Sequence, residues 1–202
     1  MSKRRGVLIE NGKRILDPLS AHALEMALLT REQFGGEVFV MMLGKKKEEE
    51  LLRSALAMGA DRAVRVEPPQ SNPDTSPEVE WVSGFVKVKI LVRAIRKIGE
   101  SFDLFLLGAS SLERGFGEFP SRLAAALDVP FMLDVSKVAV SPPAVLGVGA
   151  LSPKPRIPNA LAVMKAGKKP LDVLTQEALG INELENWMQV QVVSRTYWPG
   201  GE

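Results

Sequence analysis

The sequence predicts an α/β domain with a mainly parallel sheet flanked by helices, and two observations lead to this prediction. Up to Pro130, short apolar runs of strand length alternate with stretches whose apolar residues recur at helical spacing. Parallel strands need such helical crossovers, because the chain must return to the same end of the sheet before the next strand begins. The length of 202 residues and the hydrophobic content of 46% allow one sizeable buried core, so we expect residues 1–202 to form a single domain.

Four strands and four helices are expected before Pro130, in strict alternation. The apolar runs that predict strands cover residues 6–10, 37–43, 62–67 and 103–108. The helical patterns cover residues 18–33, 48–58, about 82–99 and 118–127. Asp17 followed by Pro18 is typical of a helix N-cap with proline at the first helical position, and Gly59 suits the end of the second helix.

The pattern changes after residue 130. Two β-prone runs, 131–140 and 143–149, follow one another with no helical pattern between them, which predicts an added β section. The proline-rich polar stretch 68–77 is typical of an exposed connection. A second polar, proline-marked stretch, 152–170, follows the β section.

The composition excludes several kinds of chemistry. The chain has no cysteine, so it can form no disulfide, thiolate nucleophile or iron–sulfur cluster, and its one histidine, His22, cannot build a histidine metal site. No serine–histidine–acid arrangement is recognisable, and we expect His22 to serve packing or a surface hydrogen bond. We therefore expect no metal site and no catalytic residue, and redox chemistry in this chain would need a borrowed cofactor.

Charge and hydropathy bear on partners and location. A net charge of +2 gives no general electrostatic basis for binding nucleic acid. No apolar run approaches the roughly 20 residues that cross a bilayer, and the start, MSKRRGVLIE, lacks the apolar core of a secretory signal. We expect no nucleic-acid partner, no transmembrane segment and a cytoplasmic location, although a mature mitochondrial matrix protein would have the same features.

The first candidate site is the stretch GASSLERGFGEFPSRLAAAL, residues 108–127, where a strand ends, glycines follow and a helix begins. Backbone N–H groups at a helix start can hold an anion, and ligands of parallel sheets lie outside the carboxyl ends of the strands. Gly115-Phe116-Gly117 matches neither a Walker loop nor GxGxxG. From the residues alone, a simple turn and a phosphate cradle both remain open.

Residues 51–67, LLRSALAMGADRAVRVE, resemble the corresponding segment of the electron-transfer flavoprotein beta subunit family. Further matches follow the family's order: DPLSAHALEMAL, DLFLLGASS, SRLAAALDVP, PAVLGVG and PRIPNALAVMKAGKKPLDVL. The resemblance covers the chain from about Asp17 to Asn182 and marks it as a short, divergent member. It implies a Rossmann-like, adenine-nucleotide-binding fold and a beta-like subunit whose alpha-like partner holds most of the FAD. It also implies that electrons come from an acyl-CoA or other flavin dehydrogenase.

The resemblance also implies which residues face a cofactor: Asp17, Leu19, Gly44, Ser111, Gly115 and Gly117. The nucleotide loop departs from the family pattern, because the stretch from Leu112 to Pro120 lacks the usual aspartate and threonine. Asp17 replaces an asparagine, and an anion beside a phosphate would oppose binding unless it is turned away or paired. AMP, a second FAD or nothing in this pocket therefore remain open.

Ala160, Leu161 and Lys165 correspond to the family's partner-recognition loop, and a C-terminal segment from about residue 183 to its partner-contacting arm. An exposed apolar anchor beside basic residues can combine burial with electrostatic steering. An ordinary amphipathic segment with a solvated lysine-rich end remains the alternative. For the whole chain, the alternative is an adenine-nucleotide-binding or structural module of the same fold that has lost electron transfer. We expect an electron-carrier subunit more than a self-sufficient enzyme.

Overall fold

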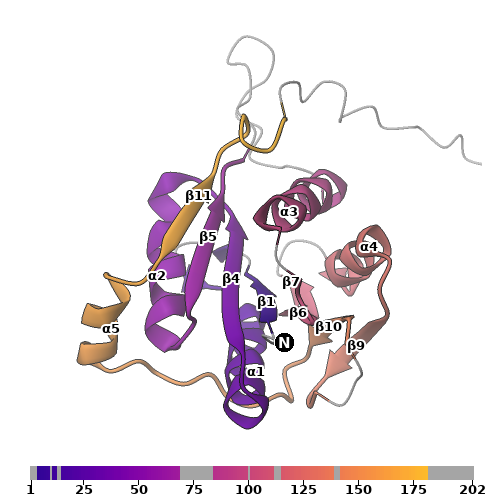
Figure 1. Ribbon diagram of the computed structural model, residues 1–202. Coiled ribbons are helices and arrows are strands. Elements are labelled where there is room, and N and C mark those ends of the chain that lie inside the picture. The colour runs from indigo at the N-terminus through magenta and orange to yellow at the C-terminus, as the bar shows by residue number, and fades with distance from the viewer. Residues whose placement is uncertain are drawn as a thin grey trace, which may run out of the picture.

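A seven-stranded sheet, parallel throughout, forms the centre of the computed structural model (Figure 1). The structure describes residues 4–9, 11–12, 15–68, 84–99, 101–111, 115–138 and 142–181. The strands of the sheet are β1 (Arg4–Leu8), β4 (Glu37–Leu43), β5 (Arg62–Val66), β6 (Leu104–Gly108), β9 (Phe131–Val135), β10 (Ala144–Val148) and β11 (Leu171–Leu174). Their order across the sheet is β11-β5-β4-β1-β6-β10-β9.

The remaining elements are helices and two small antiparallel pairs. The helices are α1 (Pro18–Phe34), α2 (Glu49–Met58), α3 (Gly84–Ile98), α4 (Glu118–Leu127) and α5 (Ala160–Ala166), with a short 3-10 turn, η1 (Lys46–Glu48), before α2. The small pairs are β2 (Asn11–Gly12) with β3 (Ile15–Leu16), and β7 (Ser110–Ser111) with β8 (Gly115–Phe116). The predicted alternation before Pro130 is confirmed within the described residues.

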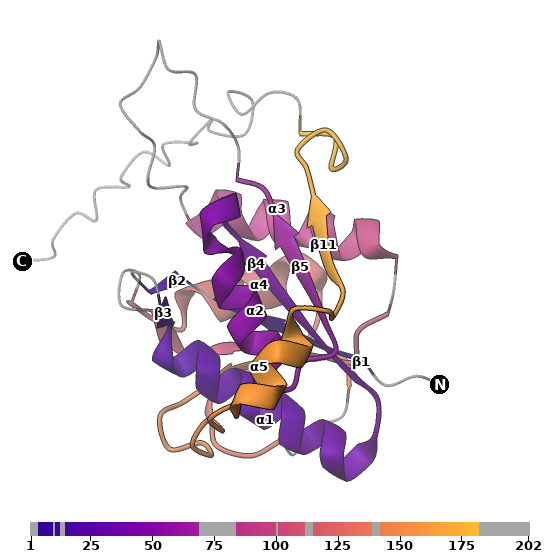
Figure 2. The same cartoon turned by 90° about the vertical axis from the view of Figure 1, so that its left-hand side faces the viewer.

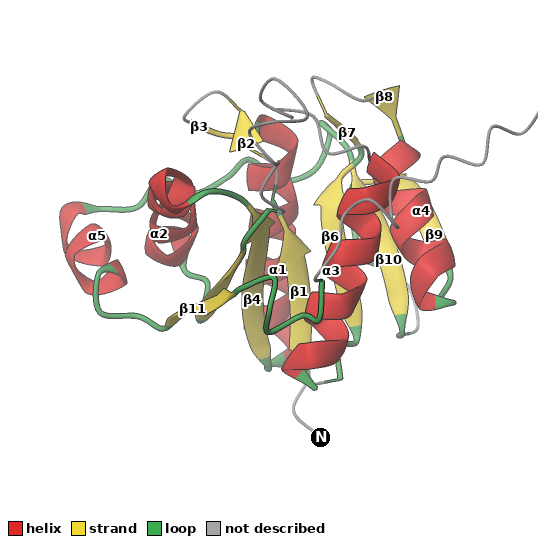
Figure 3. Ribbon diagram, turned by 90° about the horizontal axis from the view of Figure 1, so that it is seen from above, coloured by secondary structure: helices red, strands yellow, loops and turns green. Residues whose placement is uncertain are grey.

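The helices cover both faces of the sheet (Figure 3). One core cluster joins the apolar sides of α1 and α2 to side chains such as Val7, Val40 and Leu106. The other joins α3 and α4 to the opposite face, which carries Leu8, Val64 and others. Strand residues of successive positions point to opposite faces, so strands buried on both faces read as continuous apolar runs. This explains the runs that predicted the strands.

The order of the strands reverses beside β1. The chain moves outward from β1 to β4 and β5, then crosses back through α3 and places β6 on the other side of β1. Helix α1 therefore leaves β1 on one face, whereas α4 leaves β6 on the other. Such a reversal opens a crevice at the carboxyl ends of the strands, and this is where α/β sheets of this kind bind ligands.

Both β-prone runs after Pro130 form strands, and both join the main sheet. Strand β10 pairs in parallel with β6 and with β9, so it lies between them. The register of β9 against β10 shifts between Leu146 and Val148, because β9 carries an extra residue there and Asp134 adopts a φ of 57°. The added β section is thus an extension of the parallel sheet.

The polar, proline-marked stretch 152–170 contains a helix, and a further strand follows it; neither element was predicted from the sequence. After β10 the chain passes α1 and reaches the opposite edge, where α5 lies beside α2 and β11 pairs with β5 (Figures 1 and 2). Asn159 caps α5, since its Oδ1 accepts a hydrogen bond from Ala162 N at 2.9 Å. The Pro-Asn pair before an apolar run was the available sequence signal.

Polar contacts hold this crossing segment against α1. The guanidinium of Arg156 donates to both carboxylate oxygens of Glu25, which is 5% exposed, and to Glu32 Oε1 at 2.7 Å. The hydrogen bond from Arg156 lowers the pKa of Glu32 below its ordinary value. The segment that delivers α5 is therefore fixed to the body of the molecule by charge-assisted hydrogen bonds.

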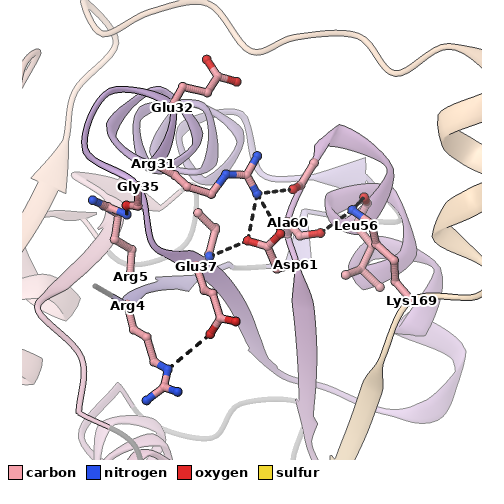
Figure 4. A network of polar contacts seen from close by, with 12 residues as sticks. Arg4, Arg5, Arg31, Glu32, Gly35, Glu37, Leu56, Ala60, Asp61 and Lys169 are labelled. Atoms are coloured by element: carbon pink, nitrogen blue, oxygen red, sulfur yellow. Dashed lines mark hydrogen bonds and ion pairs between the residues drawn. The ribbon is translucent and has the colours of Figure 1, made fainter. Parts of the chain in front are cut away.

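The motif GADR, residues 59–62, connects α2 to β5, and Gly59 ends α2 as predicted. Arg31 Nη1 donates to Gly59 O at 2.9 Å and to both carboxylate oxygens of Asp61, and Asp61 Oδ2 also accepts from Val38 N (Figure 4). Arg62 reaches across to Asp172 of β11 at 2.8 Å. These contacts give the motif a structural role, because they connect α1, β4 and β11 to the turn between α2 and β5.

Candidate functional site

The carboxyl ends of the central strands meet at one edge of the molecule. Parallel register aligns β1 with β4 and β6, and it pairs Val148 of β10 with Gly108 of β6. The N-terminus of α1 and that of α4 both begin at this edge, on opposite faces of the sheet. We call this region the carboxyl-edge crevice and define it by the described residues 9, 11–12, 15–19, 43–45, 108–111 and 115–118.

All six residues expected to face a cofactor lie in the carboxyl-edge crevice. Asp17 and Leu19 begin α1, and Gly44 directly follows β4. Ser111 and Gly115 pair with each other in the β7–β8 hairpin, and Gly117 immediately precedes α4. The structure therefore brings these positions to one edge from three different strand ends, and their role in binding stays a prediction.

Asp17 is a helix cap. Its Oδ2 accepts a hydrogen bond from Ser20 N at 2.9 Å, and the residue is only 5% exposed. The predicted N-cap is thus confirmed, with Pro18 at the first helical position. One carboxylate oxygen is committed to the helix start, and the positive end of α1 compensates part of its charge.

Gly117 has a structural reason to be glycine. Its φ is +75°, and an added Cβ would lie 2.7 Å from Leu133 Cδ2. Its N–H donates to Ala109 O at 2.6 Å, so that amide is already used. Pro120 has no N–H, so Glu118 and Phe119 are left as the first-turn amides of α4 that can face an anion.

Both backbone polar groups of Gly44, its N–H and its carbonyl, form hydrogen bonds with residues of β5. Gly44 N donates to Val66 O at 3.0 Å, and Gly44 O accepts from Arg65 Nη1 at 3.1 Å. Arg65 is 4% exposed and also pairs with Glu49 and Glu67. A Cβ at Gly44 would meet Glu48 Oε2 at 2.8 Å, which leaves little room for a side chain.

Sequence reasoning missed Arg65. The available signal was a charged residue within the apolar strand sequence RAVRV, because such a residue must find acceptors inside the protein. A buried arginine needs several acceptors, and here two carboxylates and a carbonyl supply them. Arg65 thereby fixes the segment after β4 against the start of α2.

His22, expected to serve packing or a surface hydrogen bond, forms a partly buried hydrogen bond. Its Nδ1 lies 2.9 Å from Ser152 Oγ, and that hydroxyl donates to Gly149 O at 2.6 Å. Since the one hydroxyl hydrogen points to Gly149, Nδ1 of His22 must be the donor toward Ser152. The contact ties the second turn of α1 to the segment that leaves β10.

Ala160, Leu161 and Lys165 lie apart from the carboxyl-edge crevice. They belong to α5, which packs on α2 at the β11 edge, whereas Gly117 lies across β1 from that edge (Figure 2). The large apolar side chains in and before α5 are strongly exposed: Ile157 93%, Leu161 58%, Val163 55% and Met164 74%. The chain thus presents two separate surfaces, a polar edge with helix starts and an apolar helix.

Within the described ranges, no group of three or more histidine, aspartate or glutamate side chains is arranged to hold a metal ion. None of the helices in those ranges combines the length and apolar character needed to span a membrane.

These features define the class of protein, a doubly wound Rossmann-like α/β domain with its loops gathered at the carboxyl edge. The family model described as Electron transfer flavoprotein domain matches residues 5–153. That match covers well over half of the chain, so the chain belongs to this family.

Named relatives agree with the family match. The chain is similar to the electron transfer flavoprotein subunit beta of Bacillus subtilis, with 27% identity over 97% of this chain and 83% of the relative. The subunit of the same name from Sus scrofa is 28% identical over 89% of this chain and 75% of the relative. Protein FixA of Azorhizobium caulinodans is 33% identical over 62% of this chain and 43% of the relative.

Proposed function

We propose that the chain is the beta-like subunit of a heterodimeric electron-transfer flavoprotein. In this role it carries electrons from a dehydrogenase to a downstream acceptor through FAD that an alpha-like partner mainly holds. The observation that carries the proposal is the alignment of nearly the whole chain with a relative named as a beta subunit. We place its work in the cytoplasm or the mitochondrial matrix.

The carboxyl-edge crevice supplies groups that suit one wall of a cofactor site. FAD, when bound, supplies the redox chemistry, and the protein holds and orients it. The N-terminus of α4 offers the amides of Glu118 and Phe119 to a phosphate, and we assign Gly115, in the hairpin before α4, to the same wall. The Asp17 carboxylate, which accepts from Ser20 N, caps the start of α1 on the opposite face of the sheet. Leu19, Gly44 and Ser111 are the remaining residues that we assign to this wall.

We propose the second surface, α5, as the place where the dehydrogenase docks. Leu161 and Met164 are exposed apolar side chains on a fixed element, and Lys165 adds a positive charge beside them. Exposed apolar groups with a charged rim are typical of protein–protein contacts. We assign residues from about 183 onward, which lie outside the described residues, to contact with the alpha-like partner.

One observation favours the alternative, a module whose own nucleotide pocket is no longer used. Gly117 is one of the residues predicted to face a nucleotide, but its N–H already donates to Ala109 O. The close approach of Leu133 accounts for the glycine at this position without a ligand. A pocket for AMP or a second FAD would have to rely on the two remaining amides of the turn. The alternative keeps the fold and the partner surfaces and gives up the bound nucleotide.

The test is to purify the chain alone and with the alpha-like protein encoded beside it, and to identify released nucleotides by mass spectrometry. We expect FAD only in a stable heterodimer, and reduction of that FAD by an acyl-CoA dehydrogenase that has received its substrate. AMP or a second FAD released from the heterodimer would assign the pocket. If no pair forms and no flavin is recovered in either preparation, the electron-transfer function is wrong. Adenine nucleotide bound by the isolated chain without flavin would instead favour an adenine-nucleotide-binding module of the same fold that has lost electron transfer.

A further inference from the structure

Apolar burial does little to hold α5. The helix has seven residues, and Ala166 is the one that is buried, whereas Leu161, Val163 and Met164 are each more than half exposed. A helix this short is not stable on its own in water. Contacts with the rest of the molecule must therefore fix both its existence and its orientation.

Two cations fix it by capping two helices reciprocally. Arg53 of α2 donates through Nη1 to Ala166 O at 2.9 Å and to Lys169 O at 2.8 Å, at the C-terminal end of α5. Lys169, in turn, donates through Nζ to Leu56 O at 3.0 Å and Ala60 O at 2.6 Å, at the C-terminal end of α2 (Figure 4). Each cation meets one carbonyl of a last helical turn, Ala166 O or Leu56 O, and one carbonyl of the residues that follow the helix, Lys169 O or Ala60 O. Both cations therefore lie near the negative end of a helix dipole.

The arrangement has a cost for Lys169, because partial burial disfavours the charged form of its ammonium group. Burial lowers the pKa of Lys169, although the Asp61 carboxylate acts in the opposite direction. Lys168, its neighbour, is exposed to solvent. Of these two adjacent lysines, Lys169 is the one turned inward to the carbonyls of α2.

We infer that Arg53 and Lys169 are positioning residues that hold α5 in the orientation in which it meets a dehydrogenase. The inference rests on the proposed function, because it takes α5 as the docking helix. Neither side chain needs to touch the partner. Their effect reaches the partner through Leu161 and Met164, which α5 holds out to solvent.

The variants Arg53→Gln and Lys169→Gln remove the cations one at a time in the full chain. Arg53→Lys keeps a cation that can donate to two carbonyls, so it serves as the conservative variant. Lys168→Gln makes the same charge change beside Lys169 without touching the carbonyls of α2. Thermal melting of all four variants identifies any that fail to fold. If the variant at Arg53 or at Lys169 does not fold, the variant at the other residue still tests the inference.

Two measurements decide the outcome. Hydrogen exchange of residues 160–166 in the isolated chain should become at least about tenfold faster in both glutamine variants, with exchange of β1 and β4 unchanged. In the heterodimer, the concentration of acyl-CoA dehydrogenase that gives half the maximal rate should rise about tenfold in both glutamine variants, because α5 is less often in the docking orientation. The maximal rate and the FAD content should be retained. Arg53→Lys and Lys168→Gln should resemble the wild type in both measurements.

Unchanged exchange over 160–166 would overturn the inference, whatever the partner does. Faster exchange with an unchanged half-saturating concentration would also overturn it, because the caps would then be structural only. Loss of FAD and of the maximal rate would likewise mark a general structural role. If the wild-type heterodimer accepts no electrons, the proposed function fails and the docking role falls with it, while the exchange result still reports separately on the caps.

Discussion

Leu133 shows how one side chain can decide the identity of two distant residues. Its Cδ atoms occupy the space where a Cβ on Gly117 or on Gly147 would lie, each at 2.7 Å. Gly117 precedes α4 and Gly147 belongs to β10, so Leu133 of β9 locks the helix start to the sheet. Glycine in this loop is thus required for packing before any ligand is considered.

Replacing Gly117 with alanine should therefore destabilise the fold. The positive φ costs about 1–2 kcal/mol for a residue with a Cβ, and the contact with Leu133 adds about 1–3 kcal/mol of overpacking. Gly180→Ala is the matched control, because Gly180 has a φ of +65° and nothing within 4 Å of an added Cβ. Equilibrium urea unfolding should show the larger loss for Gly117→Ala, and the added truncation Leu133→Ala should remove the excess. Equal losses in the two single variants would refute the role of Leu133.

At the scale of elements, the segment between β10 and α5 depends on one ion-paired cluster. Glu25 is buried on α1, and the Arg156 guanidinium and main-chain N–H are donors to its carboxylate. Ser152 adds a second attachment through His22. The exposed residues Leu151 and Ile157 are carried on this fixed path and not on a free loop.

Arg156→Met should cost roughly 3 kcal/mol of stability, because it leaves a buried carboxylate without its cation. The double variant Glu25→Met with Arg156→Met should recover most of that loss, since no uncompensated charge remains. Denaturant unfolding of both single variants and the double variant gives the coupling between the two sites. Additive losses would show that the pair does not act as a unit. Arg122→Met, which breaks the exposed pair with Glu118 on α4, is the control and should cost under about 1 kcal/mol.

Elements with a strong local pattern were predictable, and those defined by tertiary contacts were not. The run EVFVMML and the cap Asp17-Pro18 carry their own signals, and the strand and helix form where expected. In contrast, α5 has one buried residue and β11 is four residues long. Neither element therefore shows enough apolar periodicity to be recognised within a polar, proline-rich stretch of sequence. The site positions came from the family resemblance. Arg65 had a sequence signal, as a charged residue within an apolar run, whereas the roles of Arg53 and Lys169 depend on acceptors that only the fold brings to them.

The whole molecule is organised around β1, which has paired neighbours on both sides. In contrast, β9 and β11 lie at the two edges of the sheet. The candidate cofactor residues gather beside the centre, and the candidate docking helix lies beyond one edge. The part that we propose to hold the cofactor is therefore built on the best supported strands.

Hydrogen exchange should follow this organisation. Amides of β1 and β6 should open only with global unfolding, because both strands are paired on two sides and covered by helices. Amides of β9 and β11 should exchange through smaller openings, with free energies below the global value from denaturant unfolding. Native-state exchange with fragment analysis measures this order. Protection of β11 equal to that of β1 would contradict it.

The place of β11 beside β5 also matters while the chain is being synthesised. Strands β1, β4 and β5 leave the ribosome early, whereas their outer neighbours, β6 and β11, come later, with β11 the last of the sheet. Until then the β5 side of the nascent sheet has an open edge, which can pair with other chains. Arg62 puts a positive charge on that strand, and a charge on an edge strand discourages such pairing until Asp172 and its neighbours cover the edge.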